Sequence, residues 1–365
     1  MTETSSYARA GVDTAAGDLA VELMKAAVSK THGASVVGGL GGFAGLFDVS
    51  FLKDFDRPLL ATSTDGVGTK VAIAQALDKH DTIGQDLVGM VVDDIVVVGA
   101  RPLLMTDYIA CGKVVPERIA DIVRGIALAC EATGTALVGG ETAEHPGLLG
   151  PDDYDVAGAA VGAVEADDLL GAQRVVDGDV VIAMASSGLH SNGFSLVRHI
   201  LRERGIGYSD RLDELGVVGE ALLEPTRLYT SPLLGLLESH PGALHALSHV
   251  TGGGIAANLA RVLPVGSWTE VERSTWSPPP VFRVLSDLAG STLESAEGTW
   301  NLGIGMIAVV SAAASAGVTA ELAARGIPSW EIGRVSTSTR DLAGFEQGAK
   351  GVNGGAVRLS GVYAN

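Results

Sequence analysis

Residues 59–74, LLATSTDGVGTKVAIA, join two apolar segments through a polar turn that contains two glycines. The first apolar run ends at residues 62–65, and Asp65 is the last of these. A strand that ends in an acid, followed by a glycine turn and a lysine, can present a carboxylate and an ammonium to a phosphate or a metal. A tight surface turn with incidental charges fits the stretch equally well. A Walker A loop is excluded, because Thr69 separates the second glycine from Lys70.

Two further acidic segments favour a functional interpretation. The valine-rich segment after this turn has strand propensity, but its length and spacing favour a helix on which Asp86, Asp93 and Asp94 share one face. Adjacent acids among valines are costly to bury unless they are paired or bound to a metal. Farther along, Glu141 follows a predicted strand and two glycines, so its carboxylate can reach a bound ion.

A glycine-rich segment precedes the opening stretch. Residues 36–46 read VVGGLGGFAGL, in which backbone amides can approach phosphate oxygens because no Cβ intrudes. The spacing of Gly39, Gly41 and Ala44 imitates a dinucleotide fingerprint, but no clear strand precedes it and no helix follows. A nucleotide-covering loop is the functional interpretation, and a plain mobile loop is the alternative.

Two segments in the second half of the chain have the same predicted strand–turn–helix arrangement. The predicted strand 180–185 leads into SSGLHSNG, residues 186–193, and then into a helix. The turn 251–254 leads in the same way from a strand into a helix. Such a helix start is an anion-binding geometry. A lone histidine is usually structural, but the context of His190, in SGLHSNG at a helix start, favours a functional role. His190 can donate to a phosphate or transfer a proton.

Composition limits the class of protein. A chain of 365 residues that is 47% hydrophobic can bury a large core, and its length suggests two domains. The net charge of −18 disfavours nucleic acid and anionic membrane surfaces as partners, but not a small anionic substrate. Cys111 and Cys130 have no metal-like spacing, and no signal sequence or membrane-spanning run is recognised. We therefore expect a cytoplasmic protein.

Polarity rises near residues 165–178, so we predict domains at 1–168 and 169–365, with a flexible tail at 336–365 that is rich in Gly, Ser, Thr and Asn. The first domain is expected to begin with a helix capped by Asp13. Its apolar stripe comprises Leu19, Leu23, Ala26 and Ala27, and Lys25 lies off that stripe.

Taken together, the motifs resemble one family. GGLGGFAGLF, TSTDGVGTK, HDTIGQDL, VDD, GARPL, VGGETAEHPG, SSGLHSNGFSLVR, EPTRLY, HVTGGG and NLGIGM occur in the order typical of phosphoribosylformylglycinamidine cyclo-ligase, also called AIR synthetase. The resemblance extends over about residues 7–335. The chain departs from the family pattern at Asp93, Leu189 and Trp300, where relatives often carry Asn, Pro and Phe.

The resemblance implies an ATP- and Mg²⁺-dependent step of purine biosynthesis, in which formylglycinamidine ribonucleotide is closed to aminoimidazole ribonucleotide with release of ADP and phosphate. It also implies a two-domain α/β (α+β) fold and a homodimer. The N-terminal domains would bind ATP and form a shared β-barrel, and each C-terminal α/β domain, with helices on a mixed sheet, would bind substrate.

The family motifs also imply roles for individual residues. Catalytic roles would belong to Asp65, Lys70 and His190. The metal would be held by Asp65, Asp94 and Glu141. Contacts to ATP would come from Lys25, Gly39, Gly41, Gly42, Phe43, Asp65, Thr69, Lys70 and Gly140. The ribonucleotide would meet Ser191, Asn192, Thr251, Gly252, Gly253 and Gly254.

Other functions remain open at this point. Selenophosphate synthetase and thiamine-phosphate kinase share the expected fold, although the former usually needs a cysteine early in the chain, and Cys111 is the first here. A non-catalytic nucleotide-sensing dimer is an alternative of a different class. Substrate-dependent ATP hydrolysis separates it from an enzyme.

Overall fold

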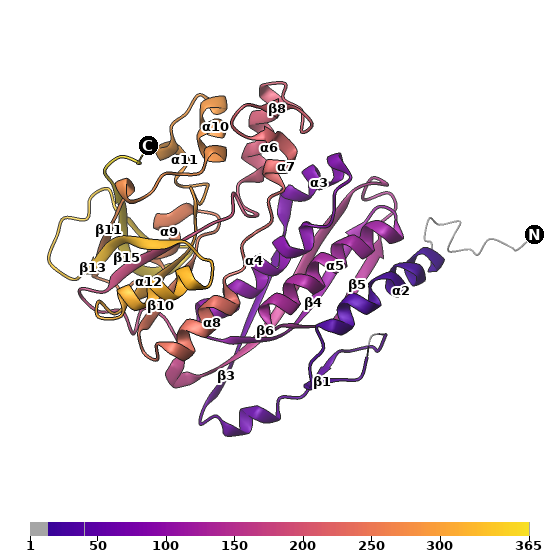
Figure 1. Cartoon of the computed structure of the whole chain (residues 1–365), viewed down its shortest axis with the longest axis horizontal. Coiled ribbons are helices and arrows are strands. Elements are labelled where there is room, and N and C mark those ends of the chain that lie inside the picture. The colour runs from indigo at the N-terminus through magenta and orange to yellow at the C-terminus, as the bar shows by residue number, and fades with distance from the viewer. Residues whose placement is uncertain (1–13, 40, 365) are drawn as a thin grey trace, which may run out of the picture. The chain divides into compact units, whose positions relative to one another are not determined.

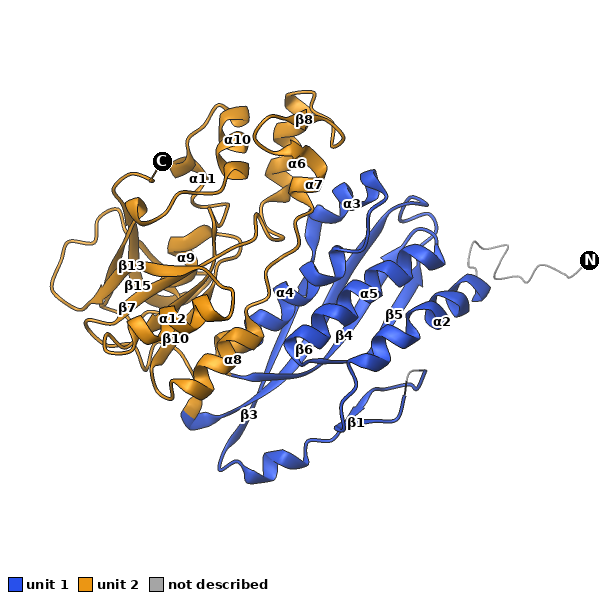
Figure 2. Cartoon of the chain, in the orientation of Figure 1, with its two compact units in different colours: residues 1–95, 100–167 blue, residues 96–99, 168–365 orange. Residues whose placement is uncertain are grey.

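The computed structural model describes residues 14–39 and 41–364 (Figure 1). It divides into two compact units, which Figure 2 shows in blue and orange. Unit 1 contains the described residues up to 95 together with 100–167, and unit 2 contains 96–99 and the described residues from 168 onward. The assignment of ATP binding and dimerisation to the first predicted domain, and of substrate binding to the second, stays a prediction.

Unit 1 is built on a four-stranded sheet in the order β3-β6-β4-β5. Strands β3 and β4 run antiparallel to β6, and β4 runs parallel to β5. The elements are α2 (Thr14–Lys30), β1 (Val36–Val37), β2 (Leu46–Phe47), a 3₁₀ turn (Ser50–Asp54), β3 (Pro58–Gly66), a second 3₁₀ turn (Gly68–Lys70), α3 (Val71–Leu77), α4 (Ile83–Val97), β4 (Arg101–Cys111), α5 (Pro116–Thr133), β5 (Ala136–Glu144) and β6 (Tyr154–Glu165).

The two long helices over this sheet follow from local sequence. Helix α5 starts with Pro116 at its first turn and ends at Gly134, whose φ of 68° suits glycine. Its buried positions include Ile119, Ile122, Val123 and Ile126, which recur at helical spacing. Helix α4 confirms the helical interpretation of the valine-rich segment, but its three acids do not share one environment. Asp86 and Asp93 are fully buried, whereas Asp94 is exposed.

The first helix corrects the predicted apolar stripe. In α2 the buried residues are Ala20 and Val28, while Leu19 and Leu23 are 48% and 49% exposed. The helix packs along α5, and its two buried residues are the small Ala20 and Val28. The predicted cap, Asp13, lies outside the described residues.

The two faces of the unit 1 sheet have different surroundings. Helices α4 and α5 cover one face (Figure 1), and there Met105 and Ile109 of β4 are completely buried. The alternate side chains point to the opposite face, where Leu60 is 67% and Tyr108 41% exposed. The open face of the sheet thus exposes apolar side chains, whereas the face under the helices buries them.

Unit 2 is a mixed seven-stranded sheet in the order β10-β12-β7-β13-β11-β15-β14, with only the β11–β15 pair parallel. The elements are a 3₁₀ turn (Ala166–Asp168) at the junction of the units, β7 (Val180–Ala185), α6 (Phe194–Glu203), β8 (Arg211–Leu212), β9 (Gly216–Val217), α7 (Val218–Leu222), α8 (Thr230–Ser239), β10 (Leu244–His249), α9 (Gly254–Ala260), β11 (Trp268–Glu272), a 3₁₀ turn (Arg273–Thr275), α10 (Pro280–Ala289), α11 (Leu293–Ala296), β12 (Ile304–Val310), α12 (Ser315–Ala324), β13 (Ser329–Ser336), β14 (Glu346–Ala349) and β15 (Val352–Ser360).

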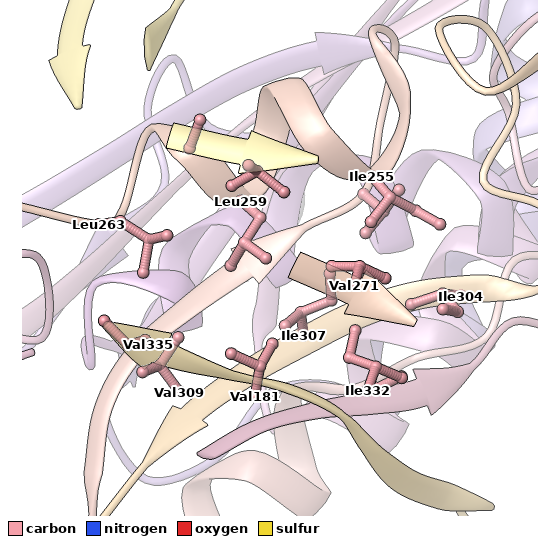
Figure 3. Close-up of a cluster of buried hydrophobic side chains, with 14 of the residues drawn as sticks. Val181, Ile255, Leu259, Leu263, Val271, Ile304, Ile307, Val309, Ile332 and Val335 are labelled. Atoms are coloured by element: carbon pink, nitrogen blue, oxygen red, sulfur yellow. The ribbon is translucent and has the colours of Figure 1, made fainter. Parts of the chain in front are cut away.

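Both faces of this sheet carry a hydrophobic core. On one face, Ile255 and Leu259 of α9 pack against Ile307 and Val309 of β12 (Figure 3). The other core contains Leu233 of α8 together with residues of α12. Because the central strands β7 and β12 are covered on both sides, their sequences are almost continuously apolar. The predicted α/β class, with helices on a mixed sheet, is confirmed for unit 2.

The predicted flexible tail, 336–365, is wrong for most of its length. Strand β15 pairs parallel with β11, and β14 pairs with β15. Val357 is completely buried, and Phe345 and Leu359 are each 8% exposed. Because the segment is rich in Gly and Ser, its few scattered apolar residues do not form a recognisable strand pattern. In the structure, pairing with neighbouring strands satisfies the backbone hydrogen bonds of this segment.

Among the residues that the structure describes, no helix combines the length and the apolar character needed to cross a bilayer.

Candidate active site

A cavity of about 570 Å³ in unit 1 lies between α2, α5, the strands β4 and β5, and the glycine-rich segment 36–46, which we call the glycine loop. Five of the residues predicted to contact ATP line it, namely Gly39, Gly41, Gly42, Phe43 and Gly140, and Glu141 of the predicted metal site does so as well. Gly41 has a φ of 98°, which favours glycine, and Phe43 is fully exposed at the tip of the loop. The volume is in the range of nucleotide-sized pockets.

Asp107 lines the same cavity and was missed by the sequence analysis. It is 8% exposed, between the buried Met105 and Ile109 of β4, and burial raises the pKa of its carboxyl to about 7. A Cβ at Gly140 would lie 2.2 Å from Asp107 Oδ1, so any larger residue there would displace the Asp107 carboxylate. The sequence signal that could have identified Asp107 is an acidic residue at an inward-facing position of a mostly apolar strand.

We expect Asp107→Asn to be more stable than the native protein at about pH 8. The folded-state pKa is above the ordinary value of 3.8, so folding opposes ionisation, and the free energy of unfolding falls as the pH rises from about 4 to about 7. Asparagine removes this cost, which amounts to as much as about 4 kcal/mol above pH 7. Thermal unfolding in EDTA at several pH values measures it. A stability difference that does not shrink toward pH 4 would contradict the pKa.

Lys70 does not line the cavity. Its ammonium donates to Asp86 Oδ1 at 2.8 Å, and both side chains are completely buried within unit 1. The preceding Thr69 is exposed. The lysine of the opening stretch thus holds the turn against α4, so a contact between Lys70 and ATP stays a prediction.

Lys25 lies on the solvent side of α2. Its side chain is 61% exposed and lies 4.0 Å from Glu22, whereas Val21 and Met24 of the same helix line the cavity. A long, exposed lysine beside the cavity rim can reach a phosphate.

The three predicted metal ligands are separated within one chain. Asp65 ends β3 at one edge of the sheet, and Glu141 belongs to β5 at the other edge, three strand spacings or about 14 Å away. Asp94 is exposed on α4. The described residues of one chain contain no group of three His, Cys, Asp or Glu side chains that could hold a metal ion. A single chain therefore does not assemble the predicted site.

His190 is held inside its loop in unit 2. It is 1% exposed with a φ of 60°, and its Nε2 accepts the backbone N–H of Ser187 at 3.2 Å and that of Arg227 at 3.5 Å. In this structure the imidazole shapes the loop 186–193. Asn301 supports that loop by donating to the Gly188 carbonyl at 2.9 Å.

The two segments predicted to bind the ribonucleotide meet directly. The backbone N–H of Gly252 donates to Asn192 Oδ1 at 3.0 Å. Gly253 has a φ of 106° and Gly254 a φ of 72°, so this turn depends on glycine. Ser191 and Thr251 flank the contact and are partly buried. The structure brings these residues together, and their role in binding substrate stays a prediction.

Comparison with known families matches both units. Residues 48–164 match the family described as AIR synthase related protein, N-terminal domain, and residues 176–342 match AIR synthase related protein, C-terminal domain. The chain belongs to the AIR synthase family. The resemblance that the motifs indicated is confirmed.

Two relatives that this chain matches over nearly their whole length carry the same name. Phosphoribosylformylglycinamidine cyclo-ligase of Shouchella clausii is 47% identical over 343 residues, which are 93% of this chain and 99% of the relative. The protein of that name from Thermosynechococcus vestitus is 46% identical over 339 residues, covering 93% and 98%.

Solved structures of more distant proteins share the fold. Thiamine-monophosphate kinase from Stenotrophomonas maltophilia aligns with a TM-score of 0.66 at 18% identity, covering 95% of this chain and 97% of the kinase. The hydrogenase maturation protein HypE in complex with ATP aligns with a TM-score of 0.62 at 18% identity, covering 95% of this chain and 92% of HypE. These similarities concern the fold alone.

Proposed function

We propose that this AIR synthase family member closes formylglycinamidine ribonucleotide to 5-aminoimidazole ribonucleotide, with conversion of ATP to ADP and phosphate, in purine biosynthesis in the cytoplasm. The observation that carries the proposal is the 46–47% identity to cyclo-ligases over more than nine-tenths of both chains. The cavity in unit 1, with its glycine loop and an acid at its rim, supports ATP as the co-substrate.

The chemistry explains the need for ATP. The formyl oxygen of the substrate is a poor leaving group, and transfer of the γ-phosphoryl to it makes a phosphorylated imidate. The amidine nitrogen then attacks the formyl carbon, a C–N bond forms and phosphate leaves. The protein positions the two ends and neutralises charge on the transferring group. The backbone amides of the glycine loop and the Lys25 ammonium are the groups of unit 1 that can do this.

Mg²⁺ fits the donor chemistry of the proposed acids, because it takes carboxylate oxygens and phosphate oxygens together. When bound, it would neutralise charge on the triphosphate. Glu141 at the cavity, with Asp65 and Asp94, would hold it. Since one chain separates these acids, the proposal requires a second copy.

We propose a homodimer in which two unit 1 sheets close into a barrel. Strands β3 and β5 are the two edges of the sheet, and the face opposite the helices exposes Leu60 and Tyr108. Closure would place β3 of one subunit beside the partner's β5, which removes both open edges. Asp65 would then approach the partner's Glu141, at the same end of the barrel.

We expect Leu60→Asp to produce a monomer without cyclo-ligase activity, because a charge would enter the apolar interior of the barrel. Sedimentation velocity measures the oligomeric state. Leu128→Asp is the matched control, since Leu128 is 57% exposed on the outer surface of α5. If both Leu60→Asp and Leu128→Asp sediment as dimers, the proposed barrel is contradicted.

The test of the function is product formation from ATP, Mg²⁺ and formylglycinamidine ribonucleotide. We expect aminoimidazole ribonucleotide, ADP and phosphate in equal amounts, and ATP hydrolysis that depends on the ribonucleotide. Nucleotide binding without such coupling would indicate a sensor. Turnover of thiamine phosphate in place of the ribonucleotide would indicate a kinase of the same fold.

A further inference from the structure

The last described residues of the chain contact a partly buried ion pair in unit 2. Arg273 donates to both carboxylate oxygens of Glu297, at 2.6 Å and 3.0 Å, and also to the Gly361 carbonyl at 3.0 Å. The Tyr363 hydroxyl donates to Glu297 Oε1 at 2.7 Å. The Tyr363 ring packs edge-on against Trp276, with the ring centroids 5.2 Å apart. Four residues from three segments thus form one cluster, which we call the tail anchor: Arg273, Trp276, Glu297 and Tyr363.

The protonation states of the tail anchor favour these contacts. Burial, followed by the Glu297 carboxylate, raises the pKa of the Tyr363 phenol, so the hydroxyl remains a donor. The hydrogen bond to Glu297 raises the pKa of Arg273 as well. The two hydrogen bonds from Arg273 and the one from Tyr363 together hold the Glu297 carboxylate in place.

Glu297 also touches the turn that the proposed function assigns to the ribonucleotide. A Cβ at Gly254 would lie 1.6 Å from the Glu297 carbonyl oxygen, so the two backbones are in direct contact. The N–H of Gly254 closes the turn by donating to the Thr251 carbonyl at 3.1 Å. The backbone at Glu297 therefore forms part of the surface against which the turn 251–254 packs.

A second connection leads from the tail anchor to the His190 loop. The Trp276 indole donates to the Leu302 carbonyl at 3.0 Å, and the neighbouring Asn301 holds the Gly188 carbonyl. The N–H of Ala364 donates to the Trp276 carbonyl at 3.1 Å, which ties the chain end to this path. Both segments proposed to bind substrate thus rest on residues that the chain end touches.

We infer that Tyr363 is a positioning residue that fixes the turn 251–254 through Glu297 and thereby tightens binding of the ribonucleotide. The inference rests on the proposed function for the identity of the substrate. Tyr363 lies beyond residue 342, where the match to the family ends. A cavity of about 270 Å³ beside Gly253 also depends on the last part of the chain, because Gly344, Glu346 and Arg358 form one of its walls.

The test is Tyr363→Phe, which removes the hydroxyl and keeps the ring on Trp276. We expect the KM for formylglycinamidine ribonucleotide to rise about tenfold, because a hydrogen bond to a charged group is lost. The kcat and the KM for ATP should stay within about twofold of the native values. Glu297→Gln should act in the same direction. Trp268→Phe is the control, since it removes a similar hydrogen bond, to the Ser338 carbonyl at 2.9 Å, away from the turn.

Hydrogen exchange provides a readout that does not depend on turnover. Amides of residues 252–255 should exchange faster in Tyr363→Phe than in the native protein and in Trp268→Phe. Unchanged exchange there, or an unchanged KM for the ribonucleotide in an active enzyme, overturns the inference. A native protein that never turns over this ribonucleotide counts against the proposed function alone, and the exchange result still decides the role of Tyr363.

Discussion

Lys70→Met is expected to lower the free energy of unfolding by about 3–5 kcal/mol. Lys70 and Asp86 form an ion pair at 2.8 Å with both side chains completely buried. Removal of the ammonium leaves a carboxylate in a region from which water is excluded, and desolvation of that charge opposes folding. Chemical denaturation of the variant and the native protein measures the difference.

Two further variants separate loss of the pair from loss of a lysine. The double variant Lys70→Met with Asp86→Leu should regain most of the stability, because neither position of the pair then carries an unpaired buried charge. Lys25→Met, at a side chain that is 61% exposed, should change stability by less than about 1 kcal/mol. Native-like stability of Lys70→Met would contradict the buried pair. A stable double variant with full activity would remove Lys70 from the catalytic residues.

Glu141→Gln and Asp65→Asn are each expected to lower kcat about a hundredfold or more, because each removes a carboxylate that would face Mg²⁺ and the triphosphate. Both substitutions preserve shape, Glu141 is exposed, and Asp65 is only partly buried, so unfolding midpoints should change little. Rates at increasing Mg²⁺ and fixed ATP measure the effect, with Asp94→Asn as a third variant. Near-normal rates in all three would remove the metal assignment.

Local sequence predicted most elements of the fold. The strand before the 186–193 turn spans residues 180–185, as its apolar run predicted. The helical interpretation of α4 was right because length outweighs the strand propensity of valine. The chain end was mispredicted, since its strands depend on pairing with β11, which lies more than eighty residues earlier.

The site was less accessible to sequence reasoning. The glycine loop, Gly140 and Glu141 could be placed together from motifs, and they line one cavity. The partner of Lys70 could not be foreseen, because the contact with Asp86 depends on how α4 packs on the turn. Asp107 was overlooked because alternate side chains of a buried strand point into the core, and its position is one of these. The separation of Asp65 from Glu141 follows from strand order, which local patterns do not determine.

The central claim is that the metal site combines Asp65 of one subunit with the partner's Glu141. The most direct test mixes Asp65→Asn and Glu141→Gln subunits under conditions that exchange subunits. A shared site leaves one of the two sites in each mixed dimer intact, so the two inactive variants should together recover about a quarter of native activity. If the mixture exchanges subunits and stays inactive, both acids act within the same subunit and the shared barrel site is contradicted.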